Sequence, residues 1–305
     1  MKHMISLCIV ALFALSAICI PQSFSTQSEI AHEAVFTEIF SAKVGNGADE
    51  IAYAEYDSSL FGPNDMSIDK NGTICLLDSQ NKRMLLISDG EIKEKITFDF
   101  CEIPVRGLRN NGNYYITDLV YDVVYEADAN GKLLNKYPLP DDVTTKFSHK
   151  LYSSNDGKLI FISSGPDVGY VSYVLSKETG KFIREDELFK FVRQTNKITV
   201  TKDGVTWNIV LPNEDFGMDF IDSDNKGNAI TFVLEPYAYS IRKYNTKGDL
   251  LGYACVPKEK VKAFSSSDNT TCVDKDGNIY YFSSEADAFR IYKVTLGDNY
   301  TFAHR

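Results

Sequence analysis

The sequence predicts an all-β chain, a six-bladed β-propeller with four-stranded antiparallel blades, from three observations. Short Asn-Gly or Asp-Gly turns between apolar strands recur along the chain, which is typical of β-hairpins. A second set of glycine turns lies 18 to 23 residues after the first. One unit of roughly 40 to 50 residues therefore holds four strands, the size of a propeller blade. Long helical patterns are absent, which excludes a protein of alternating strands and helices.

The N-terminus has the order of a secretory signal. Lys2 and His3 precede the apolar run "MISLCIVALFALSAICI", which ends at Pro21 and small polar residues. An uncleaved membrane anchor is the alternative, because the run is near the lower length limit for a spanning helix. We expect a signal peptide at residues 1–25, a linker at 26–34 and a single propeller domain at 35–305. The mature protein is then secreted or extracytoplasmic and has no membrane span.

The hairpins follow one another in two interleaved sets of turns. The first begins with "SIDKNGTICLLD" at 67–78, and the second begins with "ISDGEIKEKI". The glycines of the first, inner set are Gly72, Gly112, Gly157, Gly204, Gly227 and Gly277. Those of the second, outer set are Gly90, Gly131, Gly180, Gly248 and Gly297. Five glycine pairs predict five full blades.

The hairpin at Gly204 has no outer partner. We interpret residues 187–213 as a shortened, irregular fourth blade, which gives six blades in total; five blades with an inserted hairpin is the alternative. Trp207 lies in this segment, and packing is its expected role. The strand predicted at 35–41 precedes the first full blade. We expect it to close the ring by pairing with the C-terminal blade, because pairing removes an exposed sheet edge.

Composition and charge limit the classes of partner. The chain of 305 residues is 44% hydrophobic, which is enough for a substantial core. Its net charge of −10 disfavours binding to nucleic acid or to anionic lipid, and we expect a monomer. The cysteines beyond the signal are too widely spaced for zinc and form either buried free thiols or one disulfide. They are Cys75, Cys101, Cys255 and Cys272.

The segment "GPNDMSIDKNGTICLLDSQNKRMLLI" resembles an NHL repeat, with a Gly-Pro start, an apolar strand that ends in Asp, a Gly turn and a later Asp-Asn-Arg set. The matching residues are Gly62, Pro63, Asp69, Gly72, Asp78, Asn81 and Arg83. The resemblance is specific over residues 45–90, and other predicted blades keep only the turn. It implies a six-bladed propeller of the NHL, gluconolactonase-like and TolB-like group, and no single activity.

Polar residues that enter the innermost predicted strands are the candidate ligand-binding residues. They are expected at the channel mouth, on the face opposite the short turns. The channel-mouth set is Asn64, Asp65, Arg106, His149, Asp219 and Asn269, with Tyr121 and Tyr237 on its rim. Further candidates in the middle loops are Gln80, Asn81, Asp167, Tyr170, Glu285 and Asp287.

A metal site follows only from the resemblance. Gluconolactonase-like propellers hold a divalent ion in the channel, and Pro63-Asn64 is similar to one of their ligand segments. The implied ligands here are Asn64, Asp219 and Asn269, and oxygen-only donors suit calcium. The glutamate that this group places in its first strand has only Glu38 as a counterpart.

Nucleophilic catalysis has no readable motif, and His149 has no partner in sequence. Two classes of function therefore stay open. The first is an exported binding or scaffold propeller for a protein, peptide or glycan. The second is a calcium-dependent lactonase or hydrolase.

Overall fold

In the residues that it describes, the computed structural model is all-β apart from one short 3-10 helix, Ser79–Asn81. It describes residues 33–56, 59–141, 143, 148–154, 156–164, 169–212, 216–235, 238–257, 269–284 and 288–298. The predicted signal peptide and residues 26–32 of the predicted linker lie outside these ranges. In the described part of the chain, no helix has the length and hydrophobicity that a membrane crossing requires.

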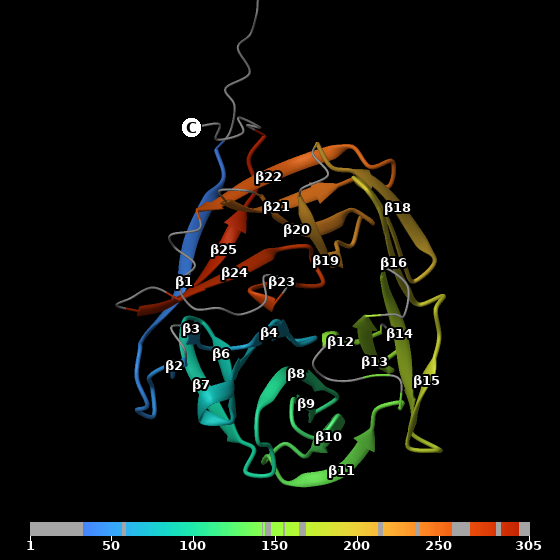
Figure 1. Ribbon diagram of the computed structural model, residues 1–305. Helices are drawn as coiled ribbons and strands as arrows, with labels where there is room; N and C mark the ends of the chain where they lie inside the picture. Colours follow the sequence, from blue (N-terminus) through green and yellow to red (C-terminus); the bar gives the residue numbers. More distant parts are fainter. Residues whose placement is uncertain are drawn as a thin grey trace, which may run out of the picture. The chain divides into compact units, whose positions relative to one another are not determined.

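Four sheets have four antiparallel strands each, in a β-propeller-like arrangement (Figure 1). The first contains β4 (Asp65–Ile68), β5 (Ile74–Asp78), β6 (Arg83–Ser88) and β7 (Glu91–Thr97). The second contains β8 (Pro104–Asn110), β9 (Asn113–Asp118), β10 (Val123–Ala127) and β11 (Leu133–Pro138). Another contains β19 (Gly217–Ser223), β20 (Ala229–Leu234), β21 (Ala238–Tyr244) and β22 (Leu250–Pro257). The last contains β23 (Thr271–Val273), β24 (Ile279–Ser284), β25 (Ala288–Thr295) and β1 (Val35–Lys43).

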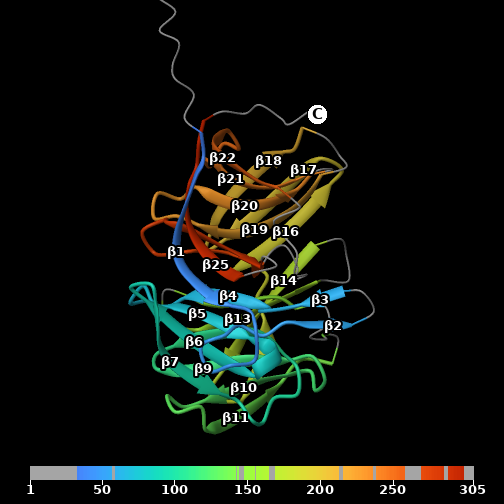
Figure 2. The same ribbon diagram turned by 90° about the vertical axis from the view of Figure 1, so that its left-hand side faces the viewer.

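The predicted N-terminal strand pairs with the C-terminal sheet, as expected. β1 lies antiparallel to β25, from Val35 opposite Thr295 to Lys43 opposite Ala288 (Figures 1 and 2). The buried ring of Phe40 packs edge-on against Phe289 at 6.4 Å between centroids. A two-stranded hairpin, β2 (Ala54–Tyr56) and β3 (Ser59–Phe61), then leads into the first sheet.

The third and fourth predicted blades are one sheet. This seven-stranded sheet contains β12 (Ser148–Ser153), β13 (Leu159–Ser164), β14 (Gly169–Ser176), β15 (Lys181–Arg184), β16 (Phe189–Gln194), β17 (Lys197–Lys202) and β18 (Val205–Val210). Strand β14 joins its two halves, because residues 173–176 pair with β15 and residues 169–171 pair with β16. The described residues thus form four four-stranded sheets, one seven-stranded sheet and the β2–β3 hairpin in place of six separate blades.

The two predicted blades merge because β16, β17 and β18 lack an innermost strand. In the first sheet, the N–H of Phe98, just after outer strand β7, donates to the Lys82 carbonyl before β6 at 2.8 Å. The N–H of Leu211, just after β18, donates in the same way to the Asn196 carbonyl before β17. β18 therefore takes the place of an outer strand, and Gly204 lies in an outer turn, not in the inner turn predicted.

Close backbone contact lets β14 cover the bare edge of β16. A Cβ at Gly169 would lie 2.1 Å from the Phe191 carbonyl oxygen, so only glycine fits there. At the point where β14 leaves β15, the buried Ser172 accepts a hydrogen bond from the Phe189 N–H at 3.2 Å. Its hydroxyl also donates to the Glu185 carbonyl. This pairing covers the edge of β16 at residues 190–192.

The two ends of the sheets differ in their connections. We call the loop face the end with the loops between second and third strands and the links between sheets, among them residues 79–82, 98–103 and 119–122. The turn face is the other end, where glycine turns such as the one at residues 69–72 lie. The core consists of five clusters of buried side chains. Trp207 is buried in one of them and donates to the Gly227 carbonyl at 2.9 Å, which confirms a packing role.

All four described cysteines are free thiols. Cys75, Cys101 and Cys272 are buried. Burial raises the pKa of the Cys75 thiol to about 12 and that of Cys101 and Cys272 further. These thiols therefore stay protonated at neutral pH and pack as small apolar groups.

A buried carboxylate links three strands of the second sheet. Glu126 accepts hydrogen bonds from the hydroxyls of Tyr115 (2.6 Å) and Tyr137 (2.5 Å). It also accepts from the amides of Asn113 and Asn135, both at 2.8 Å. Burial alone would raise the pKa of Glu126, but these four hydrogen bonds outweigh it and lower the pKa to about 2.

We expect deletion of residues 35–41 to lower the melting temperature far more than deletion of residues 26–31. Only the first deletion removes Phe40 from the core and bares the edge of β25. Thermal denaturation of the two truncated proteins measures the difference. Equal melting temperatures would contradict the structural role of β1.

Glu126→Gln is expected to lower the free energy of unfolding at pH 7, because the amide cannot accept from all four donors. The folded pKa of about 2 lies below the usual value of 4.5. The carboxylate therefore stabilises the fold fully above about pH 4.5, and this contribution is lost as the pH falls toward about 2. Urea denaturation should show the gap between wild type and variant narrowing over that range. Glu91→Gln, at an exposed carboxylate, is the control and should change stability little at any pH.

Candidate functional site

The inner strands carry most of the predicted channel-mouth residues at their loop-face ends. β4 contacts β8 and β23, and β23 contacts β19, so these strands are neighbours. The residues placed there are Asn64, just before β4, Asp65 in β4, Arg106 in β8, Asp219 in β19 and Asn269, just before β23. His149 lies in β12, but its side chain is outside the described part, as are Tyr237, Asp167, Glu285 and Asp287 entirely.

Asn64 and Asp65 fasten the first sheet to the second. The Asn64 amide donates to the Pro104 carbonyl at 3.3 Å. The Gly107 N–H donates to the buried Asp65 carboxylate at 2.8 Å. These two side chains therefore hold β8 beside β4, and their first role is positional.

Besides Arg109, which pairs with Asp69 at 3.1 Å, two cations lie on the inner strands, where the sequence predicted only Arg106. Arg106 is 8% exposed, and its guanidinium donates to the Val105 carbonyl at 3.0 Å. Lys150 of β12 reaches β19, where its ammonium donates to the Ile221 carbonyl and lies 4.0 Å from the Asp222 carboxylate. Lys150 thus connects two inner strands across the place where β16 to β18 supply none.

The Asp222 carboxylate forms ion pairs with two lysines, Lys150 and Lys202. Lys202 forms an ion pair with it, and the Lys202 ammonium also lies 5.3 Å from the centre of the Tyr152 ring. Burial would raise the pKa of Asp222, but Lys202 and Lys150 outweigh this and hold the pKa below its usual value. The sequence offered no motif for this cluster, because its members are far apart along the chain.

Tyr170 and Asp219 meet from two different sheets. Tyr170 lies at the loop-face end of β14, and its hydroxyl is 3.5 Å from the Asp219 carboxylate in β19. Both residues are partly exposed. The Tyr170 ring packs edge-on against Phe191 at 5.2 Å. A carboxylate and a phenol whose ring is fixed by packing are thus presented together at this end of the inner strands.

Tyr121, predicted on the rim, lies on a loop of the second sheet. It is 53% exposed in the loop between β9 and β10, beside Val120. The N–H of Leu119 in this loop donates to the Ile103 carbonyl at 2.9 Å, which sets the loop against the link between β7 and β8. The loop that carries Val120 and Tyr121 therefore lies beside the link that carries Ile103.

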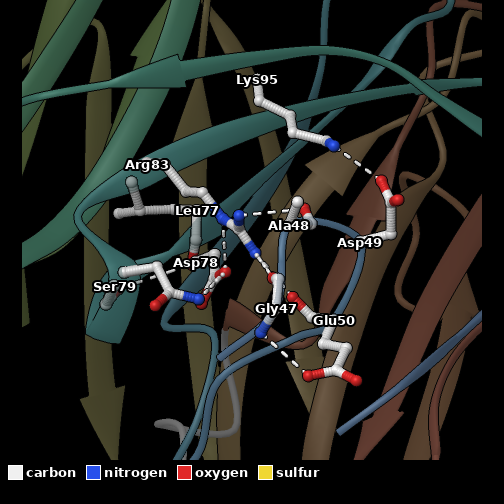
Figure 3. Close-up of polar contacts among 10 residues, drawn as sticks. Gly47, Ala48, Asp49, Glu50, Leu77, Asp78, Ser79, Arg83 and Lys95 are labelled. Atoms are coloured by element: carbon white, nitrogen blue, oxygen red, sulfur yellow. Dashed lines mark hydrogen bonds and ion pairs between the residues drawn. The ribbon is translucent and has the colours of Figure 1, made fainter. Parts of the chain in front are cut away.

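The Asp, Asn and Arg residues of the NHL resemblance form one network (Figure 3). Arg83 donates to the Asp78 carboxylate at 2.8 Å and to the carbonyls of Ala48 at 3.0 Å and Glu50 at 2.6 Å. Asn81 donates to the same Asp78 oxygen at 2.9 Å. Burial raises the pKa of Asp78 although its partners oppose the shift. The network ties the segment after β1 to the first sheet, which is a structural role.

The described side chains include no group of three or more His, Cys, Asp or Glu residues placed to hold a metal ion. The predicted ligands Asn64, Asp219 and Asn269 include one carboxylate, and it lies beside the Tyr170 hydroxyl. Glu38, the counterpart of the acidic ligand, pairs with Arg290 at 3.3 Å in the outermost strand of its sheet. Glu38 is therefore not an inner-strand ligand.

We expect Arg83→Met to lower the free energy of unfolding by roughly 3–5 kcal/mol, because it leaves Asp78 buried without its charged partner. Lys95→Met is the matched control. Lys95 pairs with the exposed Asp49 at 2.6 Å, and such surface pairs contribute less than about 1 kcal/mol. Denaturant titration of both variants compares the two. Similar losses would show that Arg83 does not hold the segment after β1.

Comparison with known proteins bears on the fold. No family model matches the chain, and no curated protein matches it. Among solved structures, it is similar to a member of the DUF4221 family from Bacteroides vulgatus, with 9% identity and a TM-score of 0.52 over 88% of this chain and 98% of that chain.

Two further solved structures are similar at lower scores. One is a gluconolactonase from Xanthomonas campestris, with 14% identity and a TM-score of 0.49 over 87% of this chain and 98% of that one. The other is a streptogramin B lyase, with 14% identity and a TM-score of 0.49 over 81% and 97%. At 9% identity, the likeness to the DUF4221 family member concerns the fold alone.

Proposed function

We propose that this protein is an exported, non-enzymatic binding propeller that holds a glycan at the loop-face ends of its inner strands. The observation that carries the proposal is the meeting of Tyr170 and Asp219, both partly exposed, from two sheets. A carboxylate accepts hydrogen bonds from sugar hydroxyls, and a phenol both donates and accepts them. The tyrosine ring adds an apolar face against which a sugar ring can pack.

The surrounding contacts support a preformed site. Asn64 and Asp65 fix β4 against β8, and Lys150 connects β12 to β19, so the inner strands have little freedom to move apart. A site on fixed strands needs little ordering when a ligand binds. Export is proposed on the basis of the N-terminal sequence at residues 1–25.

A lactonase or hydrolase that uses calcium is the competing proposal. It requires a calcium ion held by Asn64, Asp219 and Asn269. Turnover of glucono-lactone that depends on added calcium and is lost in Asp219→Asn would favour it over a binding role. We expect no turnover with or without calcium.

The test is binding of the labelled mature protein to a glycan array, followed by titration of the best glycan. Asp219→Asn should weaken binding of that glycan by about 1–3 kcal/mol, or about fivefold to 150-fold in Kd, because a charged acceptor is lost. Lys132→Ala, at an exposed turn-face residue, is the control and should leave the Kd unchanged. If Lys132→Ala abolished binding and Asp219→Asn did not, the glycan site would lie on the turn face, and the proposal would be wrong.

A further inference from the structure

Three large apolar side chains are exposed on two adjoining loops at the loop face of the second sheet. Ile103, Val120 and Tyr121 are 45%, 51% and 53% exposed. The other large apolar side chains exposed in the described residues are spread over strands β1, β11, β15, β18, β20 and β22. We call the two loops at residues 98–103 and 119–122, with these three side chains, the acidic–apolar patch.

A buried carboxylate holds both loops of the patch. Asp118, which is fully buried, accepts a hydrogen bond from the Glu102 N–H at 2.6 Å and one from the Val120 N–H at 2.8 Å. The Leu119 N–H donates to the Ile103 carbonyl at 2.9 Å, which joins the loops directly. The patch is therefore preformed, and a partner would spend little free energy on ordering it.

The charge of the patch has one sign. Its ten residues include three exposed carboxylates, Asp99, Glu102 and Asp122, and no Lys, Arg or His. Lys82, outside the patch, lies 3.5 Å from Glu102 in an exposed pair of the kind that contributes little. Apolar side chains bordered by carboxylates complement a surface that alternates apolar and basic groups.

We propose that the acidic–apolar patch docks a basic–apolar peptide segment of a partner protein. Such a segment places an aliphatic or aromatic side chain on Ile103, Val120 and Tyr121 and its lysines or arginines beside the three carboxylates. An anionic membrane surface is excluded as the occupant, because the carboxylates would repel it. This surface is separate from the glycan site proposed above and does not depend on it. A single pair of loops is a small contact, so we expect a Kd in the micromolar range, about 1–100 µM.

The test uses a fluorescein-labelled peptide that alternates lysine with leucine and phenylalanine, titrated with the mature protein and followed by fluorescence anisotropy. Ile103→Ser combined with Tyr121→Ser should weaken binding about tenfold or more, because both apolar contacts are lost. Leu134→Ser combined with Leu251→Ser is the matched control, since these residues are 46% and 47% exposed on outer strands. The control should keep the Kd within about twofold of wild type.

Two further arms separate charge from apolar contact. Glu102→Lys should weaken binding of the same peptide and make its Kd less sensitive to salt. A peptide with glutamate in place of lysine should not bind, which distinguishes the patch from a merely sticky surface. The proposal is overturned if wild type does not bind the basic peptide, or if the patch and control variants bind it alike. Equal binding of the two peptides would also overturn the proposal. In a separate measurement, fluorescein-labelled mature protein mixed with anionic vesicles should show no rise in anisotropy.

Discussion

The pairing of β1 with β25 is the interaction on which the rest of the sheet arrangement depends. It turns a three-stranded sheet with a bare edge into a four-stranded one, and it brings Phe40 into the core that the first and last sheets share. Arg83 then holds the segment that follows β1 through three backbone carbonyls. The N-terminal strand is therefore fastened at both ends, to the last sheet and to the first.

Turn chemistry made much of the fold predictable, and the need to cover an exposed sheet edge predicted the strand at 35–41 and its partner. Turn chemistry could not place β16 to β18, because an Asp-Gly turn such as that at Gly204 is equally suitable between inner and outer strands. The alternation of apolar residues is also the same whether a strand starts its own sheet or extends another. The decisive features were the missing inner strand and the close approach at Gly169, and both depend on contacts between segments.

The sequence predicted where the candidate residues lie along their strands, but it did not predict which of their side chains are exposed. Inner-strand reasoning placed Asn64, Arg106 and Asp219 at the loop-face ends of their strands, where the structure has them. It could not tell that Arg106 is buried, since burial depends on the neighbouring sheets. Lys150 was missed because its long side chain reaches across to another sheet. The acidic–apolar patch was missed because Ile103 and Val120 look like core residues in sequence.

The same β1–β25 pairing has a consequence for how the chain folds. Phe40 and Ile291 are paired although about 250 residues separate them, so this contact has a very high sequence separation. Loop closure of that length is slow, and until it happens the edge of β25 is open to other chains. Because Val35 lies opposite Thr295, a short turn could join these ends in a circularly permuted chain. The most distant contact would then become a local hairpin, and the slowest step of assembly would become one of the fastest.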